Sequence, residues 1–250
     1  NNQTNTWNDM HDINRLNASL TENTLKVYEK VSKLNCIKDM YLCGGTAQSL
    51  QMQHRKSEDL DFEIIGTSKD RPELPIGKIF NEVKSVFPEA NMEVLSETHI
   101  LIFVGDNVKL SFFRPKNSVP TLTTGYVFNS IKTPSLDELL GMKIFTTSLR
   151  LKYRDYYDIY CLVKEGYSLL KGIDYACKFS RHEVKSKTFL TNLTTAALYE
   201  PDINFELLDA KYKVTPQEIQ KEIENKLIKE KSELKPKENK PKKKIIQFKL

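Results

Sequence analysis

Two aspartates separated by one residue, Asp59 and Asp61, lie at the start of the apolar stretch DLDFEI. On a β-strand alternate side chains project from opposite faces, so the two carboxylates share one face while Leu60 and Phe62 share the other. Like charges this close repel each other and shift each other's pKa. A divalent cation relieves that repulsion, and carboxylate oxygens are the ligands that suit Mg²⁺. The spacing therefore predicts a metal-binding acid pair on a half-buried strand.

A glycine turn, Gly44-Gly45-Thr46, follows the apolar run YLC and precedes a short amphipathic stretch. Glycine lets the backbone approach a ligand closely, and the free N–H groups at the start of a helix can bind phosphate oxygens. Thr46 adds a hydroxyl donor. Alone, such a turn is typical of an ordinary helix start, and a lone D-x-D is typical of an exposed strand face. Their combination, strand–GG–helix–strand, predicts a site for a metal–nucleoside triphosphate complex.

A second group of charged residues lies between positions 143 and 158. Four residues recur at spacings of four, three and four, which makes one stripe if a single helix continues through them: Lys143, Thr147, Arg150 and Arg154. Asp155 and Asp158 are three apart and share a helix face, whereas Arg154 and Asp158 are four apart and can pair. The simplest interpretation of this group is a solvated helix face with ordinary salt bridges.

The hydrophobic periodicity predicts the elements that must position these residues. Strands are expected over 38–43, 59–65, 91–96, 99–104, 107–113 and 126–131, with a hairpin turn at Gly105-Asp106-Asn107. Helices are expected over 22–35, from the GGT turn through Leu50, and over 76–87, 135–150, 153–165, 168–179, 187–199 and 215–232. This order predicts a mixed α/β half followed by an all-helical half. The expected division is 1–133, 134–232 and a basic tail at 233–250, with Pro134 and Ser135 at the boundary.

Composition narrows the class of protein. The chain has 250 residues of which 39% are hydrophobic, enough for a globular core. No apolar run approaches the ~20 residues of a membrane span, and the amino terminus does not resemble a signal peptide, so we expect a cytoplasmic protein. The four cysteines form no C-x-x-C pair, which argues against zinc or a disulfide framework. The net charge of +5 resides in the tail, which either solubilises the chain or contacts nucleic-acid phosphates.

Two stretches resemble a known family. GGTAQSLQMQHRKSEDLDFEI (44–64) resembles the first motif of the nucleotidyltransferase superfamily, and most closely that of the AbiEii/AbiGii abortive-infection toxins, with GGT-A-x-x-L leading to H-R-x-S-x-D-L-D-F. LDELLGMKIFTTSLRLKYRDYYDIYCLV (136–163) resembles that group's later motifs: a helix lysine, an arginine and R-D-x-x-D. The two stretches cover about a quarter of the chain, in the family's order. The resemblance implies a nucleotidyltransferase-type α/β (α+β) fold, a mixed β-sheet with flanking helices.

The resemblance also implies roles for residues. Asp59 and Asp61 would hold two Mg²⁺ ions that bridge a nucleoside triphosphate and an acceptor hydroxyl. The GGT turn would cradle the β- and γ-phosphates, and Lys143 would neutralise their charge. Within the first motif, His54 would order the Asp59 strand, with base catalysis a lesser alternative. The remaining expectations concern two arginines. Arg55 would contact phosphate or nucleic acid, or simply pair with Glu58. Arg150 would help bind the nucleotide and, with the basic tail, place the acceptor.

One departure from the superfamily pattern concerns the metal site. Many nucleotidyltransferases carry a third acid on a neighbouring central strand, where this chain has Ser111. Either the site keeps two acids, or Asp158, and less readily Asp155, supplies the third carboxylate or activates the acceptor.

The expected reaction moves a nucleoside monophosphate onto an RNA end, such as that of a tRNA, in a toxin countered by a cognate antitoxin. Two alternatives stay open: an antibiotic-type nucleotidyltransferase with a small-molecule acceptor, and a catalytically reduced nucleotide- or partner-binding relative.

Overall fold

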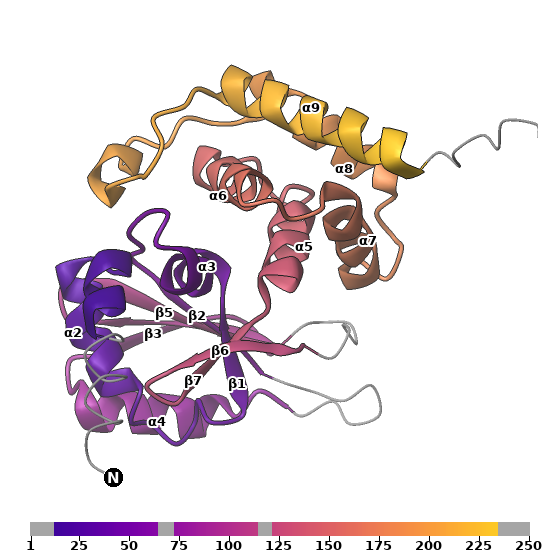
Figure 1. Cartoon of the computed structure of the whole chain (residues 1–250). Coiled ribbons are helices and arrows are strands. Elements are labelled where there is room, and N and C mark those ends of the chain that lie inside the picture. The colour runs from indigo at the N-terminus through magenta and orange to yellow at the C-terminus, as the bar shows by residue number, and fades with distance from the viewer. Residues whose placement is uncertain (1–12, 65–72, 115–121, 235–250) are drawn as a thin grey trace, which may run out of the picture.

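A mixed β-sheet forms one half of the chain (Figure 1). The structure, a computed structural model, describes residues 13–64, 73–114 and 122–234. Within these residues the sheet has seven strands in the order β3-β4-β5-β2-β1-β7-β6. The strands are β1 (Met40–Cys43), β2 (Leu60–Ile64), β3 (Asn91–Ser96), β4 (His99–Val104), β5 (Val108–Phe113), β6 (Thr124–Phe128) and β7 (Ile131–Pro134). The predicted α/β class with a helical second half is therefore confirmed.

The helices cover the sheet and then form the second half. The described helices are α2 (Glu22–Val31), α3 (Gly44–Met52), α4 (Ile76–Val86), α5 (Leu136–Thr146), α6 (Tyr153–Lys164), α7 (Leu169–Phe179), α8 (Ser186–Leu193) and α9 (Pro216–Leu234). Short 3₁₀ turns, η1 and η2, occupy Ala196–Leu198 and Phe205–Leu208. Figure 1 shows α4 below the sheet and α3 above it, facing the helical half. Helix α3 therefore lies between the sheet and the helical half and contacts both.

Register at the centre of the sheet aligns the polar residues. β2 runs antiparallel to β1, with Asp61 opposite Cys43, and parallel to β5, with Asp61 opposite Ser111. Leu60 and Phe62 are fully buried in the core below this face, as strand alternation requires. One face of β2 therefore packs in the core, and the other face carries the carboxylates.

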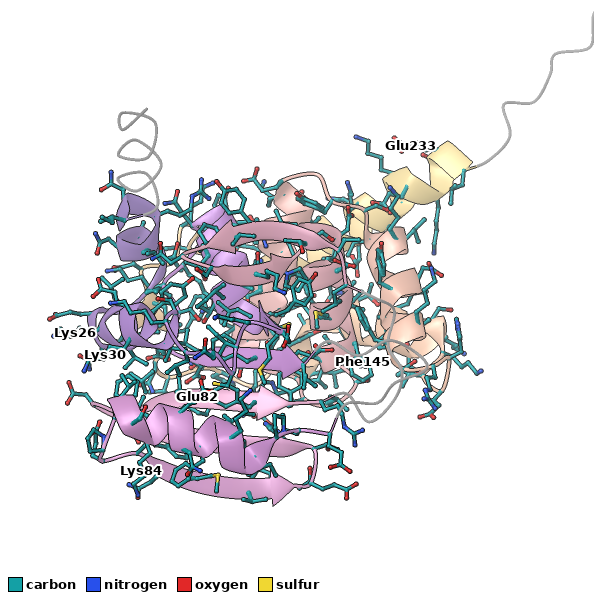
Figure 2. The ribbon with its side chains drawn as sticks, turned by 90° about the horizontal axis from the view of Figure 1, so that it is seen from below. Lys26, Lys30, Glu82, Lys84, Phe145 and Glu233 are labelled. Atoms are coloured by element: carbon teal, nitrogen blue, oxygen red, sulfur yellow. The ribbon has the colours of Figure 1, made fainter. Side chains whose placement is uncertain are left out.

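The sheet and its helices share a hydrophobic core. Val27, Leu50, Ile79 and Phe112 bring α2, α3, α4 and β5 into one buried cluster. Glu82 of α4, labelled in Figure 2, accepts hydrogen bonds from the backbone N–H groups of residues 35 and 36, at 2.8 and 2.9 Å. This contact satisfies two backbone donors and ties α4 to the chain that enters β1.

The helical half begins with a well-defined cap. The Ser135 hydroxyl accepts from the Glu138 N–H, and the Glu138 carboxylate accepts from the Ser135 N–H, which is a capping box. The predicted helix 135–150 is too long, because α5 ends at Thr146. The hydroxyls of Thr146 and Thr147 donate to the carbonyls of Met142 and Ile144. Such side-chain bonds compete with the helical pattern, so the predicted stripe through residues 143–154 does not exist.

One predicted strand is wrong. The expected strand 126–131 is a hairpin of β6 and β7, turning at Asn129 and Ser130. Both turn residues have positive φ, 44° and 72°, as two-residue hairpin turns require. Asn-Ser is a less distinctive signal than Asn-Gly, since serine rarely adopts this conformation.

The predicted helix 187–199 is also too long, because α8 ends at Leu193 and a separate 3₁₀ turn, η1, follows; the other boundaries agree with the sequence to within a few residues. In the described part of the chain, no helix is long and apolar enough to cross a membrane. The division into domains at 133 and 232 stays a prediction, and most of the predicted basic tail lies outside the described residues.

Candidate active site

The two aspartates lie at the edge of the polar face of β2. Asp59 immediately precedes the strand and Asp61 is its second residue, and both are partly accessible. Lys109 of β5 places its Nζ 2.8 Å from Asp59 Oδ2, with each side chain about one-third exposed. Among the described residues the Asp61 carboxylate makes no hydrogen bond or ion pair. Burial, and then the neighbouring Asp59, raise the pKa of Asp61, while Lys109 opposes that rise.

The glycine turn fits tightly between two sets of charges. A Cβ on Gly44 would lie 2.7 Å from Asp61 Oδ2, and Gly44 has φ of +67°, a conformation that favours glycine. A Cβ on Gly45 would lie 2.3 Å from an Arg55 Nη2 atom and 3.5 Å from Asp158 Oδ2. Both glycines are therefore required by close approach. The turn separates the aspartate pair from a buried ion cluster on its other side.

That cluster centres on Asp158 of α6, which is fully buried. Its Oδ1 lies 2.8 Å from His54 Nε2 and 2.7 Å from Arg55 Nε, and its Oδ2 lies 2.8 Å from Arg55 Nη2. Lys143 Nζ of α5 adds a contact of 2.7 Å to Oδ2. Burial alone would raise the pKa of Asp158, but Arg55 and Lys143 hold it well below its ordinary value. Asp158 is therefore a permanent anion whose oxygens are occupied.

Asp155 completes the cluster one helical turn earlier. Its Oδ1 accepts from Lys143 Nζ at 2.8 Å and its Oδ2 from Arg150 Nε at 2.9 Å. Burial alone would lower the pKa of Lys143, but Asp155 and Asp158 together keep it raised. The three cations Arg55, Lys143 and Arg150 exceed the two aspartates by one formal charge. This surplus is the cationic side of the site.

Two arginines connect the cluster to the aspartate pair. The side chain of Arg150 is 57% exposed, and its charge interacts with Asp61. Arg154 lies within electrostatic reach of Asp59, but it pairs with Asp202 and, at 3.4 Å, with Glu58. The sequence-based pairing of Arg154 with Asp158 is therefore wrong. The first turn of α6 points Arg154 outward to the segment before η2, whereas Asp158 points inward.

The family now follows from comparison with known proteins. Residues 28–237 match the model of the family described as nucleotidyl transferase AbiEii toxin, type IV TA system. The chain belongs to this AbiEii family. An uncharacterised protein of Aquifex aeolicus (strain VF5) is 29% identical over 154 residues, which is 56% of this chain and 66% of that protein. The match therefore spans just under two-thirds of that relative.

One solved structure shares the fold of this AbiEii protein, and a second gives a lower score. The crystal structure of a "putative nucleotidyltransferase from H. pylori" gives a TM-score of 0.50 with 20% identity, covering 86% of this chain and 98% of that one. MenT4, a nucleotidyltransferase toxin of Mycobacterium tuberculosis H37Rv, gives a TM-score of 0.49 with 13% identity over 76% and 74% of the two chains.

Several residues of the first motif turn away from the predicted ligand. The Thr46 hydroxyl is buried, lies 2.7 Å from Ser57 Oγ and contacts the Asp59 carbonyl, so it braces the loop before β2. Arg55 pairs with Asp158 and not with Glu58. His54 orders Asp158 and stacks on Tyr157, so the expectation that it orders the Asp59 strand is wrong. Burial lowers the pKa of His54, which keeps the imidazole neutral.

Ser111 lies on the strand beside Asp61, at the position where many nucleotidyltransferases carry a third acid. Ser111 stands directly opposite Asp61 on the neighbouring strand, and its Oγ lies 2.9 Å from His99 Nε2. Neither Asp155 nor Asp158 joins the aspartate pair: no group of three or more His, Cys, Asp or Glu residues suited to a metal occurs in ranges 13–64, 73–114 and 122–234. Of the carboxylates predicted to bind metal, Asp59 and Asp61 are therefore the two that lie together at the start of β2.

These two carboxylates fit a hard divalent cation. Asp61 is unengaged within the described chain, Asp59 is held by one partly exposed lysine, and Gly44 leaves open the space beside Asp61 Oδ2 that a Cβ would fill. Oxygen ligands with room for water and phosphate oxygens suit Mg²⁺. Lys109 is the residue of this site that the sequence did not single out, although it shares a strand face with Ser111.

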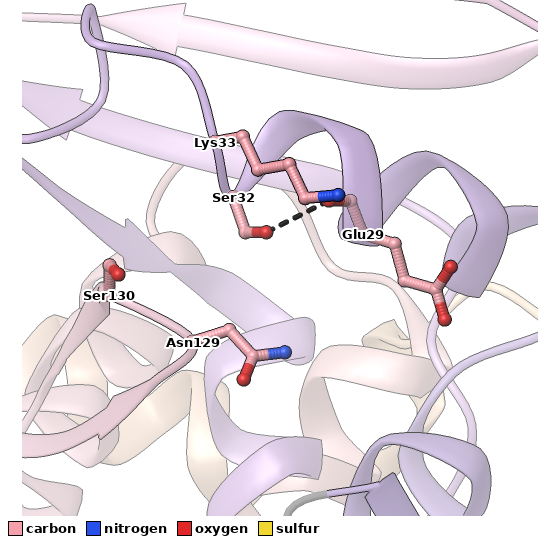
Figure 3. A pocket seen from close by; sticks show the side chains of 5 residues that line it. All are labelled: Glu29, Ser32, Lys33, Asn129 and Ser130. Atoms are coloured by element: carbon pink, nitrogen blue, oxygen red, sulfur yellow. Dashed lines mark hydrogen bonds between the residues drawn. The ribbon is translucent and has the colours of Figure 1, made fainter. Parts of the chain in front are cut away.

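A shallow hollow elsewhere is unrelated to this site. Glu29, Ser32 and Lys33 of α2 and its C-terminal end line it together with the β6–β7 turn (Figure 3). By contrast, Thr24 near the other end of α2 donates to the Glu58 carbonyl beside Asp59. The helix therefore separates the hollow from the aspartates.

Proposed function

We propose that this AbiEii protein transfers a nucleoside monophosphate from a nucleoside triphosphate to an acceptor hydroxyl, most suitably at an RNA end such as that of a tRNA. One observation carries the proposal: Asp59 and Asp61, partly exposed, lie beside a glycine turn whose other side is a net cationic cluster. An acid pair next to cationic residues is what a metal-bound triphosphate needs.

In this proposal Asp59 and Asp61 would hold Mg²⁺, as two ions when nucleotide is present. The metal would supply charge stabilisation for the oxygens that gain charge during transfer. The backbone of Gly44 and Gly45 approaches the phosphates, and Arg150 contributes an exposed guanidinium. The acceptor oxygen bonds to the α-phosphorus as the bond from that phosphorus to the bridging oxygen breaks. Pyrophosphate leaves with the electron pair, and the hydroxyl proton passes to water.

The roles of the buried ions differ from those expected from sequence. Lys143, Asp155, Asp158, His54 and Arg55 are enclosed and occupied by each other. We assign them the task of fixing the glycine turn and the Arg150 guanidinium against the aspartates. Positioning of this kind accounts for much of phosphoryl-transfer catalysis.

The charge around the aspartates supports RNA over a cationic antibiotic as acceptor. Lys109, Lys143 and Arg150 interact electrostatically with Asp61, and Arg154 interacts with Asp59. They suit an anionic acceptor. Family membership implies an antitoxin partner. A reaction that uses triphosphates and RNA is expected to take place in the cytoplasm.

A labelling experiment tests the function. The chain is incubated with Mg²⁺, total bacterial RNA and each α-³²P-labelled nucleoside triphosphate in turn, beside Asp59→Asn/Asp61→Asn. Label in an RNA band that the double variant loses supports the proposal. Triphosphate binding that needs both aspartates, without RNA labelling, indicates a small-molecule or protein acceptor. Absence of binding indicates a catalytically reduced relative.

A further inference from the structure

We propose that Lys109 is the resident counter-ion of the aspartate pair and exchanges partners when substrate binds. Its ammonium neutralises Asp59 in the empty site and pairs with triphosphate oxygens once metal takes Asp59. This inference rests on the proposed function, since it names the residue that couples metal binding to nucleotide binding.

The placement of Lys109 is set by the sheet. β2 and β5 run parallel, with Leu60 opposite Leu110 and Asp61 opposite Ser111. Lys109 therefore lies next to Asp59 and on the same face as Ser111. Its Nζ is 2.8 Å from Asp59 Oδ2, and it has the largest charge interaction with Asp61.

The contact is suited to exchange because it is only partly buried. Lys109 and Asp59 are 33% and 34% exposed, in contrast to the 7% and 0% of the Lys143–Asp158 pair. Ion pairs open to solvent are weak, whereas enclosed pairs are costly to break. The structure thus holds two lysine–aspartate pairs of different character, one on each side of the glycine turn. Lys143–Asp158 is enclosed and fixed, whereas Lys109–Asp59 is open to solvent and can be replaced.

Charge gives the exchange its direction. Two carboxylates and one ammonium leave the pair with a single negative charge, since Ser111 supplies no third acid. A divalent cation alone is therefore repelled by Lys109 while it is attracted by the aspartates. When the cation arrives with a triphosphate, the three donors of the ammonium gain anionic acceptors, so the repulsion is relieved. We expect weak binding of free metal and strong binding of metal with nucleotide.

Binding of Mn²⁺, measured by electron paramagnetic resonance, tests this without any turnover. Titrations are made with Mn²⁺ alone and with Mn²⁺ plus α,β-methylene nucleoside triphosphates, which cannot undergo the transfer. Lys109→Met should bind free Mn²⁺ about five- to tenfold more tightly and the Mn²⁺-bound analogue more weakly by a similar factor. Lys109→Arg keeps the charge and should stay close to wild type in both titrations.

The matched control is Lys84→Met, which removes the same charge from exposed Lys84 on α4, labelled in Figure 2, where its ammonium lies 5.3 Å from the Phe80 ring centroid. It should behave as wild type. Unchanged Mn²⁺ affinity in Lys109→Met, or tighter binding of both metal and analogue, would overturn the inference.

A separate variant distinguishes this from failure of the proposed function. If Asp59→Asn/Asp61→Asn binds Mn²⁺ as wild type does, the metal site itself is wrong. If the double aspartate variant loses Mn²⁺ binding while the Mn²⁺ affinity of Lys109→Met is unchanged, the proposed metal site is supported and Lys109 has no part in metal binding. Thermal melts of each variant confirm folding, which a one-third exposed side chain should not disturb.

Discussion

Arg55 and Asp158 meet in a two-point contact, with Nε 2.7 Å from Oδ1 and Nη2 2.8 Å from Oδ2, although 103 positions separate them in the chain. Arg55 precedes β2 and Asp158 lies on α6, so this contact joins the sheet to the helical half. Gly45 lets the guanidinium pass, because any Cβ there would occupy its place. The pair therefore fixes the geometry of the site without touching the expected ligand position.

Asp158→Asn should destabilise the fold severely. The change leaves the enclosed charges of Arg55 and Lys143 partly uncompensated, and breaking such a buried pair costs about 3–5 kcal/mol. Urea denaturation measures the free energy of unfolding. Asp59→Asn is the matched control, since Asp59 is partly exposed, and it should change that free energy by less than about 1 kcal/mol. Equal stability of the two variants would contradict the assignment of Asp158 as a structural anion.

Lys143→Met and Arg150→Ala should separate stability from nucleotide binding. Lys143 is enclosed by Asp155 and Asp158, so its loss should lower the free energy of unfolding by about 3 kcal/mol. Arg150 is 57% exposed, so its loss should cost less than about 1 kcal/mol while raising the Kd for triphosphate severalfold. Denaturation and fluorescent-nucleotide titration measure the two quantities. The opposite pattern would mean that Lys143 reaches the ligand.

Gly44→Ala should damage the site, whereas Gly77→Ala should not. At Gly44 the added methyl meets Asp61 Oδ2 at 2.7 Å on a backbone with φ of +67°, which costs on the order of 1–3 kcal/mol. At Gly77, in α4, a Cβ meets nothing within 4 Å, so alanine should leave stability unchanged or raise it by up to about 1 kcal/mol. Thermal melts and Mn²⁺ titration of both variants provide the measurements. Normal Mn²⁺ binding by Gly44→Ala would show that Asp61 is not confined by the turn.

Glu63 should make stability depend on pH. Burial raises its pKa to about 7, and its Oε2 lies 3.7 Å from the Cys43 thiol. The folded chain therefore prefers protonated Glu63, so its stabilising effect is complete below pH 4.5 and is lost as the pH rises through about 7. Glu63→Gln stays neutral at every pH. Its free energy of unfolding, relative to wild type, should therefore be higher at pH 8 than at pH 5 by up to about 3 kcal/mol.

Melting curves in EDTA-containing buffer at both pH values check this expectation. Glu93→Gln, at an exposed position of β3, is the control and should follow wild type at both. If the difference in melting temperature between Glu63→Gln and wild type is the same at pH 5 and pH 8, Glu63 is ionised in the folded chain at both.

Local patterns were sufficient to predict the aspartate pair, the glycine turn and nearly all helices and strands. Strand alternation puts Asp59 and Asp61 on one face whatever the tertiary structure, and the Ser135–Glu138 capping box marks the start of α5 directly. The β6–β7 turn was missed because Asn129-Ser130 lacks glycine. The end of α5 was missed because the chain tightens there into turns whose backbone N–H groups, at residues 147–149, bond three residues back, and hydrophobic spacing does not reveal such a change.

Partners of charged residues were much harder to predict. Spacing rules consider neighbours on one helix, so they paired Arg154 with Asp158, whereas packing directs Arg154 to Asp202, 48 positions away. Lys109 was missed for the same reason, since Asp59 lies 50 positions earlier. The Lys109–Asp59 pair depends on β5 lying beside β2, and the Arg154–Asp202 pair depends on how the segment before η2 packs against α6.

The strand order also has a consequence for synthesis on the ribosome. β1 lies near the middle of the sheet, yet one of its two neighbours, β7, is paired through Tyr41 and Lys132 and is made long after β1. A nascent chain that has completed only β1 and β2 therefore presents one open edge of β1 until β7 emerges. Exposed strand edges invite unwanted pairing. The sheet is thus exposed to unwanted pairing during translation, before the helical half has been made.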